Sequence, residues 1–263
     1  MNKYSLIKDA TKIMKNTISY KVVEYMGNIG IIHLSDIHFC SENQEVICEQ
    51  LQKLLIDIKM ISEKEKISID AICLTGDLIN AGANNEKEFD LFYKKFILPL
   101  LENTKLELEN IFFVPGNHEI DTSKIDEFTE EGACTKLVDS NSIDDFFRKP
   151  SLTVLDRIAY FKDIYNKYCK AQLVYEDEFC RCYKKEIHGV SFGFACLNSA
   201  WRSSGKGYIE RGKMIIGSSQ VRKALDAISD MQIKVCLVHH PLDWLVECDQ
   251  FDVEKCIYNF DLI

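Results

Sequence analysis

Four apolar segments of this chain each end abruptly on residues that bind metal ions or phosphate, and this repetition constrains the fold most. The first segment, residues 31–34, is mostly apolar and leads into Asp36 and His38. A buried strand has this pattern when its last residues leave the core and enter a site. A carboxylate and an imidazole so close in sequence suit a transition-metal ion better than calcium.

Three later segments, residues 71–75, 111–114 and 233–238, end in the same way. The residues that follow them are Asp77 after the second segment, Asn117, His118 and Glu119 after the third, and His239 and His240 after the fourth. Each of these residues alone has an ordinary explanation, such as a helix cap or a core histidine. Their fourfold recurrence favours a functional site at the carboxyl ends of the strands of an α/β sheet.

Amphipathic helical patterns separate these segments. Apolar residues recur at helical spacing over residues 42–62 and 86–101, and again over residues 220–230. Gly76 lets the backbone turn so that Asp77 projects from the end of its strand. The alternation of strands and helices predicts a layered α/β architecture.

Two regions depart from this alternation. Residues 3–16 predict an amphipathic helix, which with its lead-in makes up residues 1–26 and precedes the main domain at 27–263. Residues 121–188 mix charged and aromatic side chains, and 151–170 has helical spacing. Because this segment is longer than a plain connection needs, we interpret it as a helical insertion or cap that shapes substrate access. A helical pair that only covers the sheet explains the pattern equally well.

Charge and cysteine content exclude some classes of function. The formal net charge of −9 argues against sequence-independent binding to a polyanion, while a local basic groove or metal ions still permit a phosphate-bearing substrate. Several of the 11 cysteines lie inside apolar runs, where a thiol behaves as a small core residue. No apolar stretch approaches the length of a membrane span. We therefore expect a reducing, cytoplasmic location and no membrane partner.

The order of the motifs resembles a known family. These motifs are Asp36-x-His38, Gly76-Asp77, Gly116-Asn117-His118-Glu119 and His239-His240, and they resemble those of the calcineurin-like metallophosphoesterases. The resemblance implies a four-layer αββα sandwich, with two mixed sheets flanked by helices and two divalent metal ions at one edge. The ligands it implies are Asp36 and His38 for the first ion, Asp77 for both ions, and Asn117 and His239 for the second.

The same resemblance implies a hydrolase that cleaves phosphate esters. Two ions that share Asp77 suit an in-line displacement at phosphorus, with attack by a hydroxide that bridges them and with His118 as the acid. Manganese is the metal we expect first, and iron and zinc fit the same mixed ligand set. His240 and Glu119 remain second-choice ligands or substrate contacts.

Details of the motifs indicate which branch of the family the chain resembles. The Asp-Arg pair that follows the bridging aspartate in serine/threonine protein phosphatases is absent after Asp77, so we do not expect protein dephosphorylation. Residues 34–38 are similar to the bacterial phosphodiesterase and nuclease side of the family. Residues 198–201 and 239–244 are similar to phosphoesterase domains at the front of large bacterial multidomain proteins. By this analogy the substrate is a phosphodiester in a nucleic acid or a nucleotide.

Two other functions stay open. One is a phosphomonoesterase or cyclic-nucleotide phosphodiesterase. In that case residues 121–188 would close a narrow pocket. The other is a regulatory or binding module with impaired catalysis. The family normally ends with a Gly-His-x-His motif after one more strand, and residues 260–263 resemble only the strand before it. We therefore expect this chain to be the front part of a longer protein with additional C-terminal domains.

Overall fold

The computed structural model describes residues 19–22, 29–80 and 85–263. The helix predicted at residues 3–16 lies outside the described residues. The described part of the lead-in is strand β1 (Ser19–Val22). No helix within the described part of the chain is long and apolar enough to cross a membrane.

The first sheet carries three of the four predicted strand ends. It contains β1, β2 (Ile29–Ser35), β3 (Ser68–Thr75) and β4 (Ile111–Val114), in that spatial order. β1 runs antiparallel to β2, whereas β2, β3 and β4 are parallel, so their carboxyl ends share one edge. β3 begins three residues before the start predicted at Ala71, because Ser68 and its neighbours pair with the start of β2.

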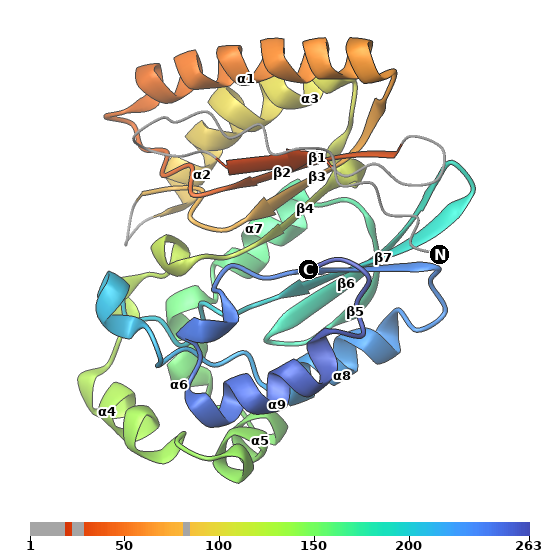
Figure 1. Ribbon diagram of the computed structural model, residues 1–263. Helices are drawn as coiled ribbons and strands as arrows, with labels where there is room; N and C mark the ends of the chain where they lie inside the picture. The colour runs from red at the N-terminus through yellow and green to blue at the C-terminus, as the bar shows by residue number, and fades with distance from the viewer. Residues whose placement is uncertain (1–18, 23–28, 81–84) are drawn as a thin grey trace.

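Helices cover the outer face of this sheet (Figure 1). α1 (Gln44–Glu65) buries an apolar stripe against the sheet, as its helical spacing predicts. The second predicted helix is continuous in space but changes geometry along its length. It consists of α2 (Asn85–Phe92), one π-helical turn (Tyr93–Ile97) and α3 (Leu98–Thr104).

The second sheet is mixed and contains the fourth predicted strand end. Its order is β5 (Gln172–Glu176), β6 (Cys180–Ile187), β7 (Val190–Leu197) and β8 (Ile233–Leu237). Only β7 and β8 are parallel to each other. Beyond β8 the pairing continues, because the backbone N–H of Cys236 donates to the carbonyl of Leu262 at 2.8 Å.

The two sheets pack face to face, and helices cover both outer faces (Figure 1). Phe112 of β4 stacks on Phe194 of β7 with ring centroids 3.8 Å apart, which joins the inner faces. α8 (Ser218–Ala227) and α9 (Glu247–Ile257) cover the outer face of the second sheet. The predicted αββα sandwich is confirmed.

The segment predicted as an insertion, residues 121–188, has two parts. Its first part is helical, and its last part supplies β5 and β6 of the second sheet. The helices are α4 (Glu127–Lys136), α5 (Ser140–Arg148), α6 (Leu152–Leu155) and α7 (Phe161–Tyr168). Short 3₁₀ turns occur at Leu108–Asn110, Asn117–Glu119, Thr122–Lys124, Asp156–Ile158, Gly207–Glu210 and Leu242–Trp244. The domain limits at 27–263 and 121–188 stay predictions.

Candidate metal centre

The ends of β2 and β3 turn sharply into one site. Asp36, His38 and Asp77 all have left-handed backbones, with φ of 57°, 50° and 51°. The N–H of Asp36 donates to the carbonyl of Gly76 at 3.1 Å, and that of His38 donates to the carbonyl of Asp77 at 2.9 Å. Non-glycine residues adopt this conformation only where the surroundings enforce it, and such strain is concentrated at functional sites.

Asp77 lies at the centre of the side chains that converge here. It is 4% exposed. One carboxylate oxygen, Oδ2, lies 3.8 Å from Nε2 of His38 and 3.9 Å from Nε2 of His118. The other, Oδ1, lies 3.5 Å from Nε2 of His239. Asp36 completes the group, with its Oδ1 3.9 Å from Nε2 of His38.

These residues form two overlapping sets of potential metal ligands. The first set is His38, Asp77 and His118, and the second is Asp36, Asp77 and His239. Within each set the ligand atoms all lie within 4.8 Å of one another. Because Asp77 belongs to both sets, one carboxylate can serve two ions.

The orientation of His239 fits a bound cation. Its Nδ1 lies 2.7 Å from the carbonyl oxygen of Thr75, which can only accept, so Nδ1 carries the proton in the neutral ring. Nε2 then directs a lone pair at Oδ1 of Asn117, 3.3 Å away, and at Oδ1 of Asp77. With Nε2 unprotonated, three acceptors face one another, an arrangement that a bound cation would stabilise. The donor set therefore fits a divalent metal ion, with its orientation set by a backbone carbonyl.

The comparison with protein families agrees with this geometry. The model of the calcineurin-like phosphoesterase family matches residues 29–263. This chain belongs to that family. Membership implies metal-dependent hydrolysis of phosphate esters.

One curated relative is similar over much of the chain. It is the "uncharacterized metallophosphoesterase-like protein YydB" of Bacillus subtilis (strain 168), which is 22% identical over 219 residues. The alignment covers 81% of this chain and 43% of the relative, so the chain spans less than half of the relative's length.

Glu119 of this calcineurin-like domain does not face the open site. It is fully buried, and its Oε2 accepts hydrogen bonds from the backbone N–H groups of Gly116 at 2.6 Å and Asp77 at 2.8 Å. Its Oε1 accepts from Leu78 at 2.7 Å and Ile79 at 3.1 Å. Burial, together with the nearby charge of Asp77, raises the pKa of Glu119 to about 7. The structure thus places this carboxylate among the backbone N–H groups of the two ligand loops, where it holds them together.

His240 is also separate from the ligand sets. Its side chain is buried at 2% exposure and its Nδ1 lies 2.9 Å from Oγ of Ser199. Burial, aided by the neighbouring His239, lowers the pKa of His240 to about 3. Of the two histidines after β8, the structure therefore brings His239 and not His240 to Asp77.

Two glycines permit the close approach of the loops. Gly76 has φ of +82°, and a Cβ there would lie 2.6 Å from the backbone nitrogen of Gly116. A Cβ on Gly116 would lie 2.3 Å from Oδ1 of Asp77. The sequence predicted the turn at Gly76. It carried no signal for the contact of Gly116 with Asp77, or for the carbonyl of Thr75 as a partner of His239.

Three of the five residues in the two ligand sets are accessible to solvent, whereas Asp77 and His239 are nearly buried. The exposed fraction of the side chain is 51% for Asp36, 37% for His38 and 38% for His118. Burial lowers the pKa of His38, although the charge of Asp77 acts in the opposite direction. The lowered pKa favours the neutral imidazole, which is the form that binds metals. The centre is thus open to solvent on the side of Asp36, His38 and His118 and buried at Asp77 and His239.

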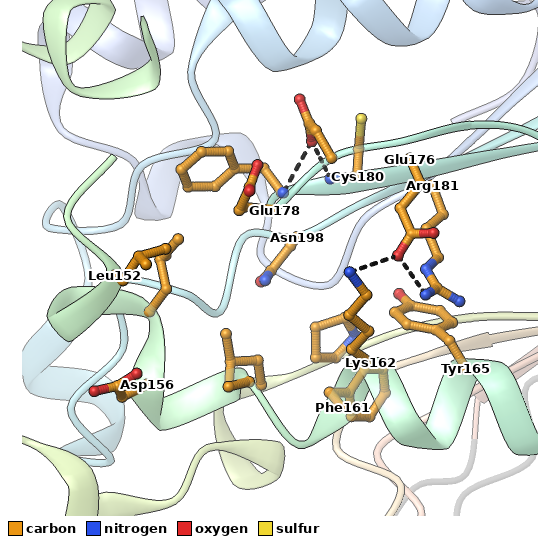
Figure 2. Close-up of a pocket in the computed structure, with 16 residues that line it drawn as sticks. Leu152, Asp156, Phe161, Lys162, Tyr165, Glu176, Glu178, Cys180, Arg181 and Asn198 are labelled. Carbon is orange, nitrogen blue, oxygen red and sulfur yellow. Dashed lines mark hydrogen bonds and ion pairs between the residues drawn. The ribbon is translucent and has the colours of Figure 1, made fainter. Parts of the chain in front are cut away.

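A separate cavity of about 250 Å³ lies between α6, α7 and the turn that joins β5 to β6 (Figure 2). Glu176 on its wall pairs with Lys162 at 3.4 Å and with Arg181 at 2.5 Å. None of the residues of the two ligand sets lines this cavity. The helical segment therefore encloses a space of its own rather than the metal centre.

Proposed function

We propose that this chain hydrolyses phosphodiester bonds in nucleic acid or nucleotides with two divalent metal ions. The observation that carries the proposal is Asp77, one buried carboxylate shared by two sets of potential ligands. The open surface around these ligands supports a diester within a long substrate over a small enclosed phosphomonoester. The same reasoning disfavours a cyclic-nucleotide pocket closed by residues 121–188.

Each ligand residue has a role in this proposal. As the family resemblance implies, Asp36 and His38 would hold one ion, Asn117 and His239 would hold the other, and Asp77 would serve both. The two geometric sets group these residues differently, with His118 beside His38 and with Asp36 beside His239. We propose manganese as the working metal because the mixed carboxylate, amide and imidazole set suits it. When bound, the ions supply Lewis-acid activation of the phosphoryl group and lower the pKa of water.

His118 is our proposed general acid. Its backbone N–H donates to Oδ1 of Asp77 at 2.9 Å, which fixes the residue beside the ligands. Its imidazole is more than a third exposed and can reach a leaving oxygen at the surface. A proton from His118 would then neutralise the alkoxide that departs when the P–O bond breaks.

The test compares manganese-dependent hydrolysis of bis-p-nitrophenyl phosphate with that of the monoester p-nitrophenyl phosphate. We expect the diester to be preferred and Asp77→Asn to remove the activity, because Asn cannot bridge two cations as an anion. His188→Ala is a matched control, since His188 is exposed and pairs with Asp70 at 2.8 Å. A preference for the monoester would contradict the proposal. Metal binding without hydrolysis of either ester would instead indicate a binding module.

His118 is tested by varying the leaving group. Acid catalysis helps a poor leaving group most, so His118→Ala should slow an alkyl or nucleoside diester by about 10²–10⁴-fold. The same change should slow a p-nitrophenyl diester far less, because p-nitrophenolate needs no proton. Equal losses with both esters, at unchanged metal content, would exclude His118 as the acid.

The cytoplasmic location is also a proposal. All 11 cysteines are free, and most of them are buried. Burial raises the pKa of Cys73 to about 12, as expected for an unreactive core thiol. Free core thiols fit a reducing compartment.

A further inference from the structure

A largely exposed loop, residues 203–213, contacts the segments that follow His118 and His239. At one end it packs against the segment that follows His118, because a Cβ on Gly205 would lie 2.9 Å from Cγ2 of Thr122. Further along, Tyr208 contacts Trp244, which follows His239 by five residues. The loop therefore touches both segments that carry ligands on this side of the centre.

The loop presents large apolar side chains to solvent. Tyr208 is 70% exposed and Ile209 is 69% exposed. The ring of Tyr208 meets Trp244 edge to face, with centroids 6.0 Å apart. Neighbouring exposed apolar side chains of this size are typical of a binding surface. We call Tyr208, Ile209 and Trp244 the aromatic platform.

A series of rings connects the aromatic platform to the metal ligands. The ring of His239 lies 4.7 Å from that of His240, measured between centroids. The ring of His240 lies 5.5 Å from that of Trp244. A substrate that binds the metals beside His239 therefore has the aromatic platform within reach of its next groups.

The loop of residues 203–213 carries three exposed cations, although the whole chain is acidic. Lys206, Arg211 and Lys213 are exposed on the same loop. Arg211 lies over the ring of Tyr208 at 5.8 Å, donates to its hydroxyl at 2.8 Å and pairs with Asp243. The acidic residue of the loop, Glu210, is 4% exposed and points inward.

Buried hydrogen bonds hold the loop in shape. The carboxylate of Glu210 accepts from the hydroxyls of Ser203 and Ser204, both at 2.6 Å. Arg157, itself 1% exposed, donates to the carbonyl of Ser203 at 2.7 Å. The aromatic platform is therefore preformed, so a ligand would lose little free energy in ordering it.

We propose that the aromatic platform stacks the bases of a single-stranded nucleic acid while the loop cations contact its phosphates. This assignment rests on the proposed phosphodiesterase function and names its substrate class. Stacking on aromatic rings beside cations is the usual way to bind a single strand, because every base has a π-face. In a duplex the faces of the bases are stacked on one another, so the aromatic platform favours unpaired strands.

The test measures binding apart from hydrolysis. The probe is a fluorescein-labelled phosphorothioate oligodeoxythymidylate, which resists cleavage, added to the manganese-loaded protein and followed by anisotropy. Tyr208→Ala should weaken binding by about tenfold, within the range for the loss of one stacked base. Tyr208→Phe should bind like the wild type, because the ring remains. An oligouridylate arm distinguishes RNA from DNA as the source of the strand.

Controls separate this inference from the catalytic proposal. Tyr258→Ala removes a tyrosine of similar exposure, 67%, at the end of α9 and should leave binding unchanged. The double variant Lys206→Gln and Lys213→Gln should bind with a weaker dependence on salt. The slope of the logarithm of the binding constant against the logarithm of the salt concentration should become shallower by about 0.7 for each phosphate that a lysine no longer neutralises. Unchanged binding by Tyr208→Ala, or no binding by the wild type, would overturn the aromatic platform even where the diester is hydrolysed. Weaker binding by Tyr208→Ala without any hydrolysis would support the platform and contradict the catalytic proposal.

Discussion

At the scale of single residues, the site depends on side chains that organise the backbone as well as on ligands. Glu119 shows this best, because its buried carboxylate accepts four backbone N–H groups from the loops after β3 and β4. Those loops carry Asp77 and Asn117. A buried polar group with every hydrogen bond satisfied fixes one conformation, and a partly satisfied one is costly.

Glu119→Gln is therefore expected to harm both stability and metal binding. The new amide would turn an NH₂ toward backbone donors and leave at least one buried N–H unpaired, at a cost of about 1–3 kcal/mol. Metal affinity should fall about 10–100-fold, as for other residues that orient ligands. Urea unfolding and manganese titration measure the two effects. Glu63→Gln, an exposed change on α1, is the control, and wild-type values for Glu119→Gln would exclude the positioning role.

At the scale of elements, a buried carboxylate joins the two helices of the second sheet. Asp249 in α9 is 2% exposed and accepts from the backbone N–H groups of Ile216 at 2.7 Å and Gly217 at 3.0 Å. These groups precede α8, so Asp249 fixes where that helix begins. Burial raises the pKa of Asp249 to about 6.

This raised pKa predicts a specific dependence of stability on pH. Between pH of about 4 and 6 the folded protein keeps a proton on Asp249 that the unfolded chain releases, so the free energy of unfolding falls as pH rises. Relative to that of Asp249→Asn, the free energy of unfolding of the wild type should fall by on the order of 2 kcal/mol as pH rises over that range. Urea unfolding across this range measures the difference.

Asp252 provides the control within the same helix. Its hydrogen bond from Lys255 lowers its pKa, so its contribution is lost as pH falls below about 4. In that lower range the free energy of unfolding of the wild type relative to Asp252→Asn should rise with pH, which is the opposite sign. A difference for Asp249→Asn that does not vary with pH would contradict the protonation of this buried carboxyl.

At the scale of the whole molecule, the candidate metal centre lies where the two sheets meet. Asp77 follows β3 of the first sheet and His239 follows β8 of the second, and their closest side-chain atoms are 3.5 Å apart. A metal ion bound by both residues would connect the sheets. Metal binding and unfolding of the sandwich should therefore be linked.

Manganese is expected to raise the melting temperature of the wild type. At a free concentration of about one hundred times Kd, a ligand adds about 2.7 kcal/mol to the free energy of unfolding. For a chain of this length that corresponds to a rise of about 5–10 °C. His239→Ala should lose most of this rise, whereas His188→Ala should keep it. A chelator should reverse the rise in the wild type, and a melting temperature indifferent to metal would exclude the link.

The sequence by itself determined the order of the elements and the places where functional residues occur. Apolar runs that stop on Asp77, Asn117 and His239 are local patterns, and they mark strand ends because a buried strand cannot continue through polar side chains. The arrangement of two sheets came from the resemblance of the motifs and was confirmed. β5 and β6 were missed as strands because their charged residues hide the alternation expected of antiparallel strands, although β5 pairs with β6 and β6 pairs with β7.

Only the tertiary structure decided what the strand-end residues do. Glu119 and His240 have the same kind of sequence position as Asn117 and His239, yet both side chains are buried and neither belongs to a ligand set. Their roles depend on contacts with residues about 40 positions away, such as Asp77 and Ser199. The aromatic platform likewise required the fold, because Tyr208 and Trp244 meet only when the loop after β7 packs beside β8. Contacts between distant residues follow from packing, and no local pattern contains them.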